Sequence, residues 1–303
     1  MADNASATWG PVEEEWILRV PGRQHLAPQA DLGTDDLRSV ICPFCVDVPS
    51  GSGAAVHSVE SKHPMVLPDD HSDSASYARH WVLVYGSSHG ERLGDLSIDV
   101  TYEFIKTVAA ITERLFRMST VKAVFAFESV GDHFGPTVAH PHGQLVGLPF
   151  VPRLLSIASP TCALCAVPSE DLLVLEVTTA NLMVSPWSRL PFEMLVAPKV
   201  HYSTLAELTN SELRDISRCI HTALNLAAST YNGRRPPYLI NIMQAARDDR
   251  SHHLRIEVVP FHKDQQTLKR PGGMELGLGI YLNPMPAKRA AKLLRQVLSG
   301  GSH

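Results

Sequence analysis

The sequence lacks the features of a nucleic-acid-binding or membrane protein. Its 27 Lys and Arg residues are outnumbered by 31 Asp and Glu residues, so the formal net charge is −4 and no basic surface is expected to attract a polyanion. No apolar run approaches the length of a transmembrane helix, and the polar residues at 13–15 are unlike the basic and then apolar pattern of a signal peptide. We therefore expect a cytoplasmic protein that acts on small molecules, with neither nucleic acid nor membrane as a partner.

Cysteine is also scarce, and its spacing is informative. Four of the five cysteines form two Cys-x-x-Cys pairs, Cys42/Cys45 and Cys162/Cys165. A redox role would need such a pair at the start of a helix in a thioredoxin-like βαβ unit, and neither pair has that context. In a reducing compartment, pairs of this kind favour zinc or another soft metal over a disulfide.

The cysteine pairs mark an internal repeat in a chain whose length allows one large domain or two of about 150 residues. Each pair is followed by a histidine, His89 or His201, with Leu four and seven positions later and a hydroxyl residue eight positions later. That residue, Ser97 or Thr209, can cap the N-terminus of a helix. The predicted helices cover 98–118 and 210–229, and the strands after them cover 121–128 and 238–243.

The repeat continues into a pattern of alternating polar residues. The segment with His140, His142 and Gln144 corresponds to the segment with His253, Arg255 and Glu257, at intervals of 51 and 52 residues from the preceding histidine (140 − 89 and 253 − 201). Residues that both copies keep are predicted to be structural. They form two four-ligand zinc sites: Cys42, Cys45, His89 and His140 in the first, and Cys162, Cys165, His201 and His253 in the second. Four ligands leave no open position for catalysis. Buried thiols are the alternative for the second set.

Residues that only the first copy keeps are the candidates for chemistry. His142 and Gln144 lie on the same face of a strand, because side chains in a strand alternate. A neutral imidazole can attack a phosphoanhydride if its other ring nitrogen is hydrogen-bonded, and an amide can donate to the phosphate oxygens. In the second copy we expect Arg255 and Glu257 to form a structural ion pair.

Several motifs resemble those of the galactose-1-phosphate uridylyltransferase family, the transferase branch of the histidine-triad superfamily. They are His-Pro-His-Gly-Gln at 140–144, Cys-Pro-Phe-Cys at 42–45 and Phe-Glu at 127–128. The resemblance covers roughly the whole chain and implies an α+β fold of two tandem histidine-triad units, with antiparallel sheets flanked by helices. It places a catalytic half at 1–158 and a decayed half, with a sugar-side loop, at 159–303. It also implies a homodimer.

The resemblance further implies ping-pong transfer of a nucleoside monophosphate, usually UMP, from a nucleotide sugar to a sugar 1-phosphate. His142 matches the nucleophile and Gln144 the phosphate-holding residue. The positions that match substrate contacts are Arg23, Ser129, Thr137, Lys269 and Glu275. Ser129 replaces a usual asparagine and Leu26 a common arginine, so the base is left open. There are three alternatives. The first is a phosphorylase that transfers AMP from an ADP-sugar or dinucleoside polyphosphate to phosphate, the second is a nucleotide hydrolase, and the third is a non-catalytic nucleotide-binding or zinc-scaffold protein.

Overall fold

A computed structural model describes most of the two predicted halves. The described residues are 6–10, 15–19, 42, 44–45, 56–60, 65–67, 76–131, 138, 140–157, 161–166, 170–231, 235–261 and 272–300. Three predicted substrate contacts, Arg23, Thr137 and Lys269, lie outside these ranges.

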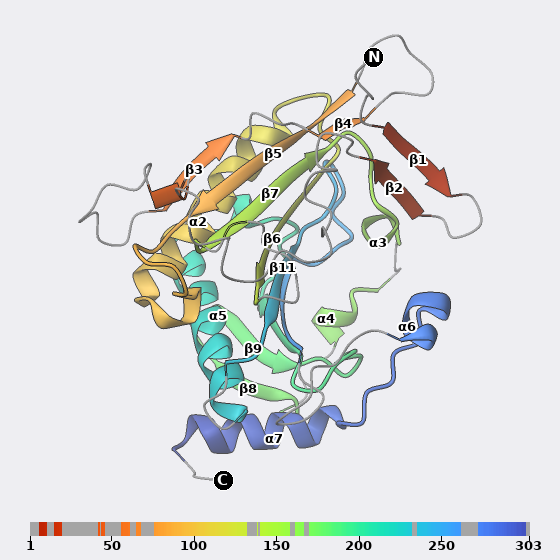
Figure 1. The fold of residues 1–303 in the computed structure, drawn as a ribbon. Helices are drawn as coiled ribbons and strands as arrows, with labels where there is room; N and C mark the ends of the chain where they lie inside the picture. The colour runs from red at the N-terminus through yellow and green to blue at the C-terminus, as the bar shows by residue number, and fades with distance from the viewer. Residues whose placement is uncertain are drawn as a thin grey trace, which may run out of the picture.

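One antiparallel sheet runs through both halves (Figure 1). Its strands follow the order β3 (His57–Glu60), β5 (Ser76–Val84), β7 (His142–Leu148), β6 (Ala123–Val130), β11 (Tyr238–Met243), β12 (Arg255–Pro260), β10 (Met194–Pro198), β9 (Ala180–Val184) and β8 (Leu173–Glu176). In addition, β4 (Met65–Leu67) pairs with β5, and β1 (Ser6–Gly10) with β2 (Glu15–Arg19). The halves meet where β6 pairs with β11, from Val130 opposite Tyr238 to Ala126 opposite Ile242.

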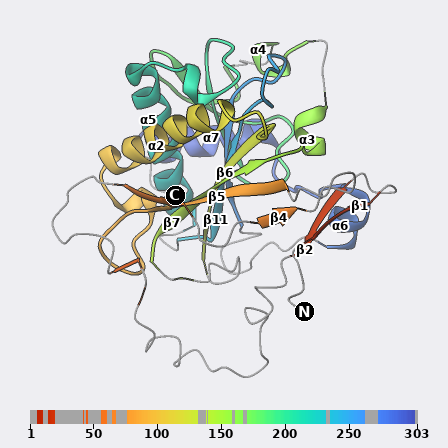
Figure 2. The ribbon, with the colours of Figure 1, turned by 90° about the horizontal axis from the view of Figure 1, so that it is seen from above.

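Two long helices, α2 (Ile98–Phe116) and α5 (Asn210–Thr230), lie on one side of the sheet (Figure 2). Ser97 and Thr209 are their N-cap residues, as predicted, and the Thr209 hydroxyl accepts a hydrogen bond from the Glu212 amide at 3.4 Å. The remaining helices are short apart from the last: η3 (Leu93–Asp95), α3 (Arg153–Ser156), α4 (Ala163–Ala166), η4 (Leu205–Glu207), α6 (Gly273–Leu278) and α7 (Ala287–Leu298).

The core beneath these helices determines which face of β7 is left for chemistry. Leu145 is fully buried on the helix side of the strand. A Cβ added to Gly143 would lie 2.5 Å from the Phe104 ring of α2, so this glycine lets the helix pack directly on the strand. Because side chains alternate along the strand, His142 and Gln144 project from the opposite face.

The two halves repeat the same arrangement, as the fold prediction requires. In the first, β5, β7 and β6 pair side by side with α2 packed over them, and in the second, β10, β12 and β11 do so with α5. One main hydrophobic core includes residues from both halves. The predicted boundary after residue 158 falls outside the described ranges and stays a prediction.

The segment predicted as a sugar-side loop begins with a helix, α6. The Glu275 carboxylate accepts a hydrogen bond from the Gly272 amide at 2.9 Å and so caps the helix N-terminus. Gly279 ends the helix in the left-handed region, with φ of 66°. No helix among the described residues is both long and apolar enough to cross a bilayer.

Candidate functional site

The first cysteine pair and two histidines form one cluster. The ligand atoms of Cys42, Cys45, His89 and His140 all lie within 4.8 Å of one another. The Cys45 Sγ is 3.1 Å from the His89 Nε2 and 3.4 Å from the His140 Nδ1. His89 lies in the turn after β5 and His140 directly precedes β7, so the cluster joins the cysteine turn to two paired strands.

The second set forms a matching cluster in the other half. Cys162, Cys165, His201 and His253 also offer ligand atoms within 4.8 Å of one another. The His253 Nδ1 lies 3.4 Å from the Cys162 Sγ and 3.5 Å from the Cys165 Sγ. The opposite ring nitrogen of His253 donates to the Pro198 carbonyl, and that of His201 donates to the Arg250 carbonyl, each at 3.0 Å. These bonds leave both Nδ1 lone pairs directed at the thiols, which is the tautomer a metal requires.

The protonation chemistry of both clusters suits a divalent cation. Burial and the adjacent cysteine sulfur raise the pKa of Cys45 and of Cys165, because two neighbouring thiolates repel each other. Burial lowers the pKa of His140 and of His253, so these imidazoles are neutral. A cation between the groups would relieve the repulsion and accept both lone pairs. Each cluster can therefore hold a metal ion.

His142 lies next to the first cluster with one nitrogen already occupied. Its Nδ1–H donates to the His140 carbonyl oxygen at 2.9 Å, which leaves the Nε2 as the nitrogen with a lone pair. Burial lowers the pKa of His142, although its bond to the His140 carbonyl acts in the opposite direction. The Phe44 ring packs edge-on against His142, with ring centroids 5.3 Å apart. The residue is thus a neutral, oriented imidazole.

Gln144 is held by a residue that the sequence did not single out. The buried His80 of β5 donates from its Nε2 to the Gln144 Oε1 at 3.0 Å. His80 stands opposite Val146 in the β5–β7 register, so it reaches Gln144 diagonally across the strand pair. The amide nitrogen of Gln144 keeps its two hydrogens for another acceptor.

A cavity of about 200 Å³ opens beside His142. Ser129, one of the predicted substrate contacts, lines this cavity. Arg92 also lines it, and the Arg92 Nη1 donates to the Pro236 carbonyl at 2.9 Å. No periodicity or residue spacing in the sequence singles out Arg92.

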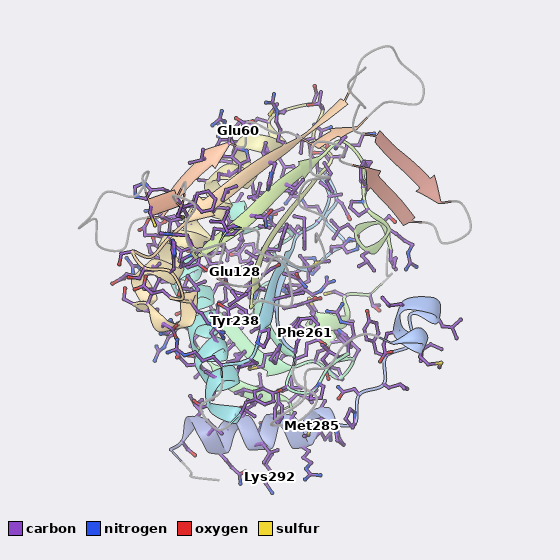
Figure 3. All side chains as sticks on the ribbon, in the orientation of Figure 1. Glu60, Glu128, Tyr238, Phe261, Met285 and Lys292 are labelled. Carbon is purple, nitrogen blue, oxygen red and sulfur yellow. The ribbon has the colours of Figure 1, made fainter. Side chains whose placement is uncertain are left out.

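Glu128, which belongs to the Phe-Glu motif and had no role assigned from the sequence, also lines this cavity. It is fully buried near the middle of the sheet, close to Tyr238 (Figure 3). Hydroxyl groups of Tyr85 and Tyr238 donate to its carboxyl group. Burial raises the pKa of Glu128 to about 8, so the carboxyl group is largely protonated at neutral pH.

The larger cavity, of about 550 Å³, is lined by residues of both halves, with Phe125 and Leu148 from the first, and it includes the counterpart of the His142 position in the second. Arg255 and Glu257 line it and form the predicted ion pair, with the Arg255 Nε 3.3 Å from the Glu257 Oε1. Arg189 adds contacts of 2.9 Å to Glu193 and 2.8 Å to Glu257. These charges are paired, and the strand offers no nucleophile at the position of His142, so we place the chemistry at the smaller cavity.

Glu275 does not line the cavity beside His142. It is buried on α6, and α6 lies away from β7 in both ribbon views (Figures 1 and 2). Its predicted role as a substrate contact stays a prediction.

The chain is similar to known proteins over almost its entire length, although no family model matches it. The galactose-1-phosphate uridylyltransferase of Thermotoga maritima is 24% identical over 95% of this chain and 97% of its own. Over almost its whole length, the chain is therefore similar to galactose-1-phosphate uridylyltransferases. The ADP-glucose phosphorylase of Arabidopsis thaliana is also 24% identical, over 95% of this chain and 91% of its own. A solved uridylyltransferase structure superposes with a TM-score of 0.80 and 22% identity over 98% of this chain and 99% of its own. The uridylyltransferase fold is therefore shared across both halves.

Proposed function

We propose that this protein is a nucleotidyltransferase that moves a nucleoside monophosphate, UMP in the first instance, from a nucleotide sugar to a sugar 1-phosphate. The observation that carries the proposal is His142, a buried imidazole whose Nδ1–H is committed to the His140 carbonyl and whose Nε2 is left as a nucleophile. The relationship to uridylyltransferases supports the same reaction.

The reaction takes place in two nucleophilic displacements at the α-phosphorus. In the first, the Nε2 lone pair of His142 attacks the α-phosphorus of the nucleotide sugar, a phosphorus–nitrogen bond forms, and the bond to the bridging oxygen breaks. The sugar 1-phosphate leaves with that oxygen. In the second, a phosphate oxygen of the incoming sugar 1-phosphate attacks the same phosphorus, and the phosphorus–nitrogen bond breaks to restore His142.

Gln144 would stabilise the negative charge that develops on the non-bridging phosphate oxygens in both steps. Its amide hydrogens can donate to the non-bridging oxygens, because the amide oxygen already accepts from His80. We assign the substrate contacts to the five predicted residues: Arg23, Ser129, Thr137, Lys269 and Glu275. Of these, Ser129 has direct support from its place in the wall of the cavity beside His142.

Zinc is the metal we assign to both clusters. Sets of two thiolates and two imidazoles, without an open position, are typical of structural zinc. Each ion would hold a cysteine turn against the sheet, the first beside His142 and the second in the decayed half. Metal analysis of the purified protein should give about two equivalents of zinc per chain, because there are two such sets.

A phosphorylase is the second candidate. The Arabidopsis relative, named an ADP-glucose phosphorylase, has the same 24% identity to this chain as the Thermotoga uridylyltransferase. The same His142 intermediate would then carry AMP, and inorganic phosphate would be the second nucleophile. The two candidates differ in the base and in the acceptor, so one experiment separates them.

Intact mass spectrometry after incubation with single donors tests the proposal. UDP-glucose, UDP-galactose and ADP-glucose are supplied separately, and the mass gain identifies the nucleotide on the protein. His142→Ala should form no adduct, whereas His221→Ala, which removes an imidazole from α5, should form it normally. Glucose 1-phosphate should remove the adduct in either case, because it reverses the first step, so inorganic phosphate makes the distinction. Loss of the adduct on adding phosphate, with release of the nucleoside diphosphate, indicates a phosphorylase, and an adduct that persists in phosphate but is lost with a sugar 1-phosphate indicates a transferase. No adduct with any donor would overturn the covalent mechanism.

A cytoplasmic homodimer is our assignment for the assembly. All five cysteines are free thiols, which suits a reducing compartment. An exposed apolar stretch at the end of the chain favours self-association, since Leu276, Leu278 and Leu282 are 78%, 68% and 57% exposed. Sedimentation equilibrium should give twice the chain mass, and a monomer at micromolar concentration would contradict the assignment.

A further inference from the structure

The strongest unexplained contact beside the candidate site is the one between His80 and Gln144. His80 is 5% exposed, and its Nε2 donates to the Gln144 Oε1 at 3.0 Å. We propose that His80 is a positioning residue, which fixes the orientation of the Gln144 amide so that its two N–H groups face the phosphate. This inference rests on the proposed function and assigns a further residue to it.

The oxygen and the NH₂ group of a glutamine have nearly the same shape, so packing alone does not distinguish them. An imidazole N–H does distinguish them, because it can only donate and therefore selects the oxygen. With His80 in place the NH₂ group is directed away from β5. Without His80 the amide can rotate and present its oxygen to the phosphate, where it would repel the non-bridging oxygens.

The second half provides independent support for this arrangement. Glu257 occupies the position equivalent to Gln144, and its carboxylate accepts from the Arg189 Nη2 at 2.8 Å. Arg189 precedes β10, which pairs with β12, just as His80 lies on β5, which pairs with β7. In both halves a basic side chain from the neighbouring strand or the segment before it holds this position. In the first half the held group is an amide that can still donate, and in the second it is a carboxylate that cannot.

A packing role and a positioning role for His80 predict different activities for two variants. His80→Phe keeps an aromatic ring of similar size but removes the donor, and His80→Gln restores a donor in a different shape. A packing role would favour the phenylalanine variant. A positioning role requires that the glutamine variant retain more activity, since only it can donate to the Gln144 oxygen.

The first experiment measures the single-turnover rate of adduct formation on His142 with UDP-glucose and with ADP-glucose. His80→Phe should lower this rate by roughly tenfold to a hundredfold, as removal of a residue that orients a functional group typically does, with the thermal unfolding midpoint retained. His80→Gln should recover part of the rate. In a Gln144→Ala background, His80→Phe should cause no further loss, because the residue acts through Gln144. A wild-type rate in His80→Phe, or an equal loss in the Gln144→Ala background, would overturn the inference.

The second experiment does not depend on the reaction. Long-range proton–nitrogen NMR correlations of the histidine rings report which nitrogen of His80 carries the proton. We expect the Nε2–H form, with Gln144→Leu changing the resonance of that proton. If the Nε2 is unprotonated, it cannot donate to Gln144, and the positioning role fails even if the adduct forms. If wild-type protein forms no adduct while the Nε2–H form and its Gln144 dependence are observed, the proposed function fails and the hydrogen bond is upheld.

Discussion

His140 and His142 are linked by a hydrogen bond in which the His140 carbonyl accepts the Nδ1–H of His142 at 2.9 Å. The ring of the same His140 faces Cys45, with its Nδ1 3.4 Å from the sulfur. One residue therefore joins the first metal cluster to the candidate nucleophile. A metal ion in this cluster would hold in place the His140 backbone carbonyl that selects the tautomer of His142.

This link predicts that the two metal clusters differ in their effect on activity. Cys45→Ser should lose one metal equivalent and most of the adduct formation, because the His140 carbonyl is no longer fixed. Cys165→Ser is the matched control, since it removes the corresponding thiol from the cluster of the second half. It should lose one equivalent and lower the unfolding temperature, with the single-turnover rate reduced much less. Metal content and rate are measured on the same samples, and equal rate losses in both variants would refute the link.

A second prediction concerns the acid limb of the reaction. Burial lowers the pKa of His142 below its ordinary value of 6.5, so the neutral nucleophile persists at pH values where an exposed histidine is protonated. The single-turnover rate of adduct formation should therefore stay high as the pH falls through 6.5 and decline only below it. The folding stability should depend on pH in the same direction as the rate. The contribution of neutral His142 to the free energy of unfolding is present above the pKa that this histidine has in the unfolded chain, and it is lost as the pH falls through its pKa in the folded protein. A rate that falls by half at pH 7 or higher would contradict this environment for His142.

The sequence predicts the parts of this molecule that depend on repetition. The helices that begin at Ile98 and Asn210, with their N-caps, recur at equivalent positions and are confirmed. The ion pair between Arg255 and Glu257 was predicted because both residues lie on the same face of a strand. His80 and Arg92 could not be found in this way. His80 contacts Gln144 across two strands and Arg92 contacts Pro236 from a distant loop, and no local period in the sequence predicts such contacts.

Gly143 shows how a motif residue can be explained by packing. Its position would bring a Cβ to 2.5 Å from the Phe104 ring, so Gly143→Ala must displace α2 or β7. We expect a loss of about 1–3 kcal/mol in the free energy of unfolding, which is typical of overpacking. Gly277→Ala is the control, because a Cβ there meets no atom within 4 Å. Adding Phe104→Leu to Gly143→Ala should recover part of the loss in urea unfolding, and identical stability of the two alanine variants would contradict this account.

The last prediction concerns Glu128, whose pKa is about 8 in the folded protein against an ordinary value of 4.5. Because the folded pKa lies above the unfolded one, the stability from the protonated form is fully present below 4.5 and is lost as the pH rises through about 8. Glu128→Gln keeps a neutral group of the same shape between Tyr85 and Tyr238 and does not ionise. Its free energy of unfolding, relative to the wild type, should therefore rise by about 1 kcal/mol or more between pH 5 and pH 9, the equivalent of one pKa unit. Glu103→Gln, on the exposed face of α2, provides the control for removing one carboxylate. A constant difference between Glu128→Gln and the wild type across this range would show that Glu128 is ionised at both pH values, with its charge compensated inside the sheet.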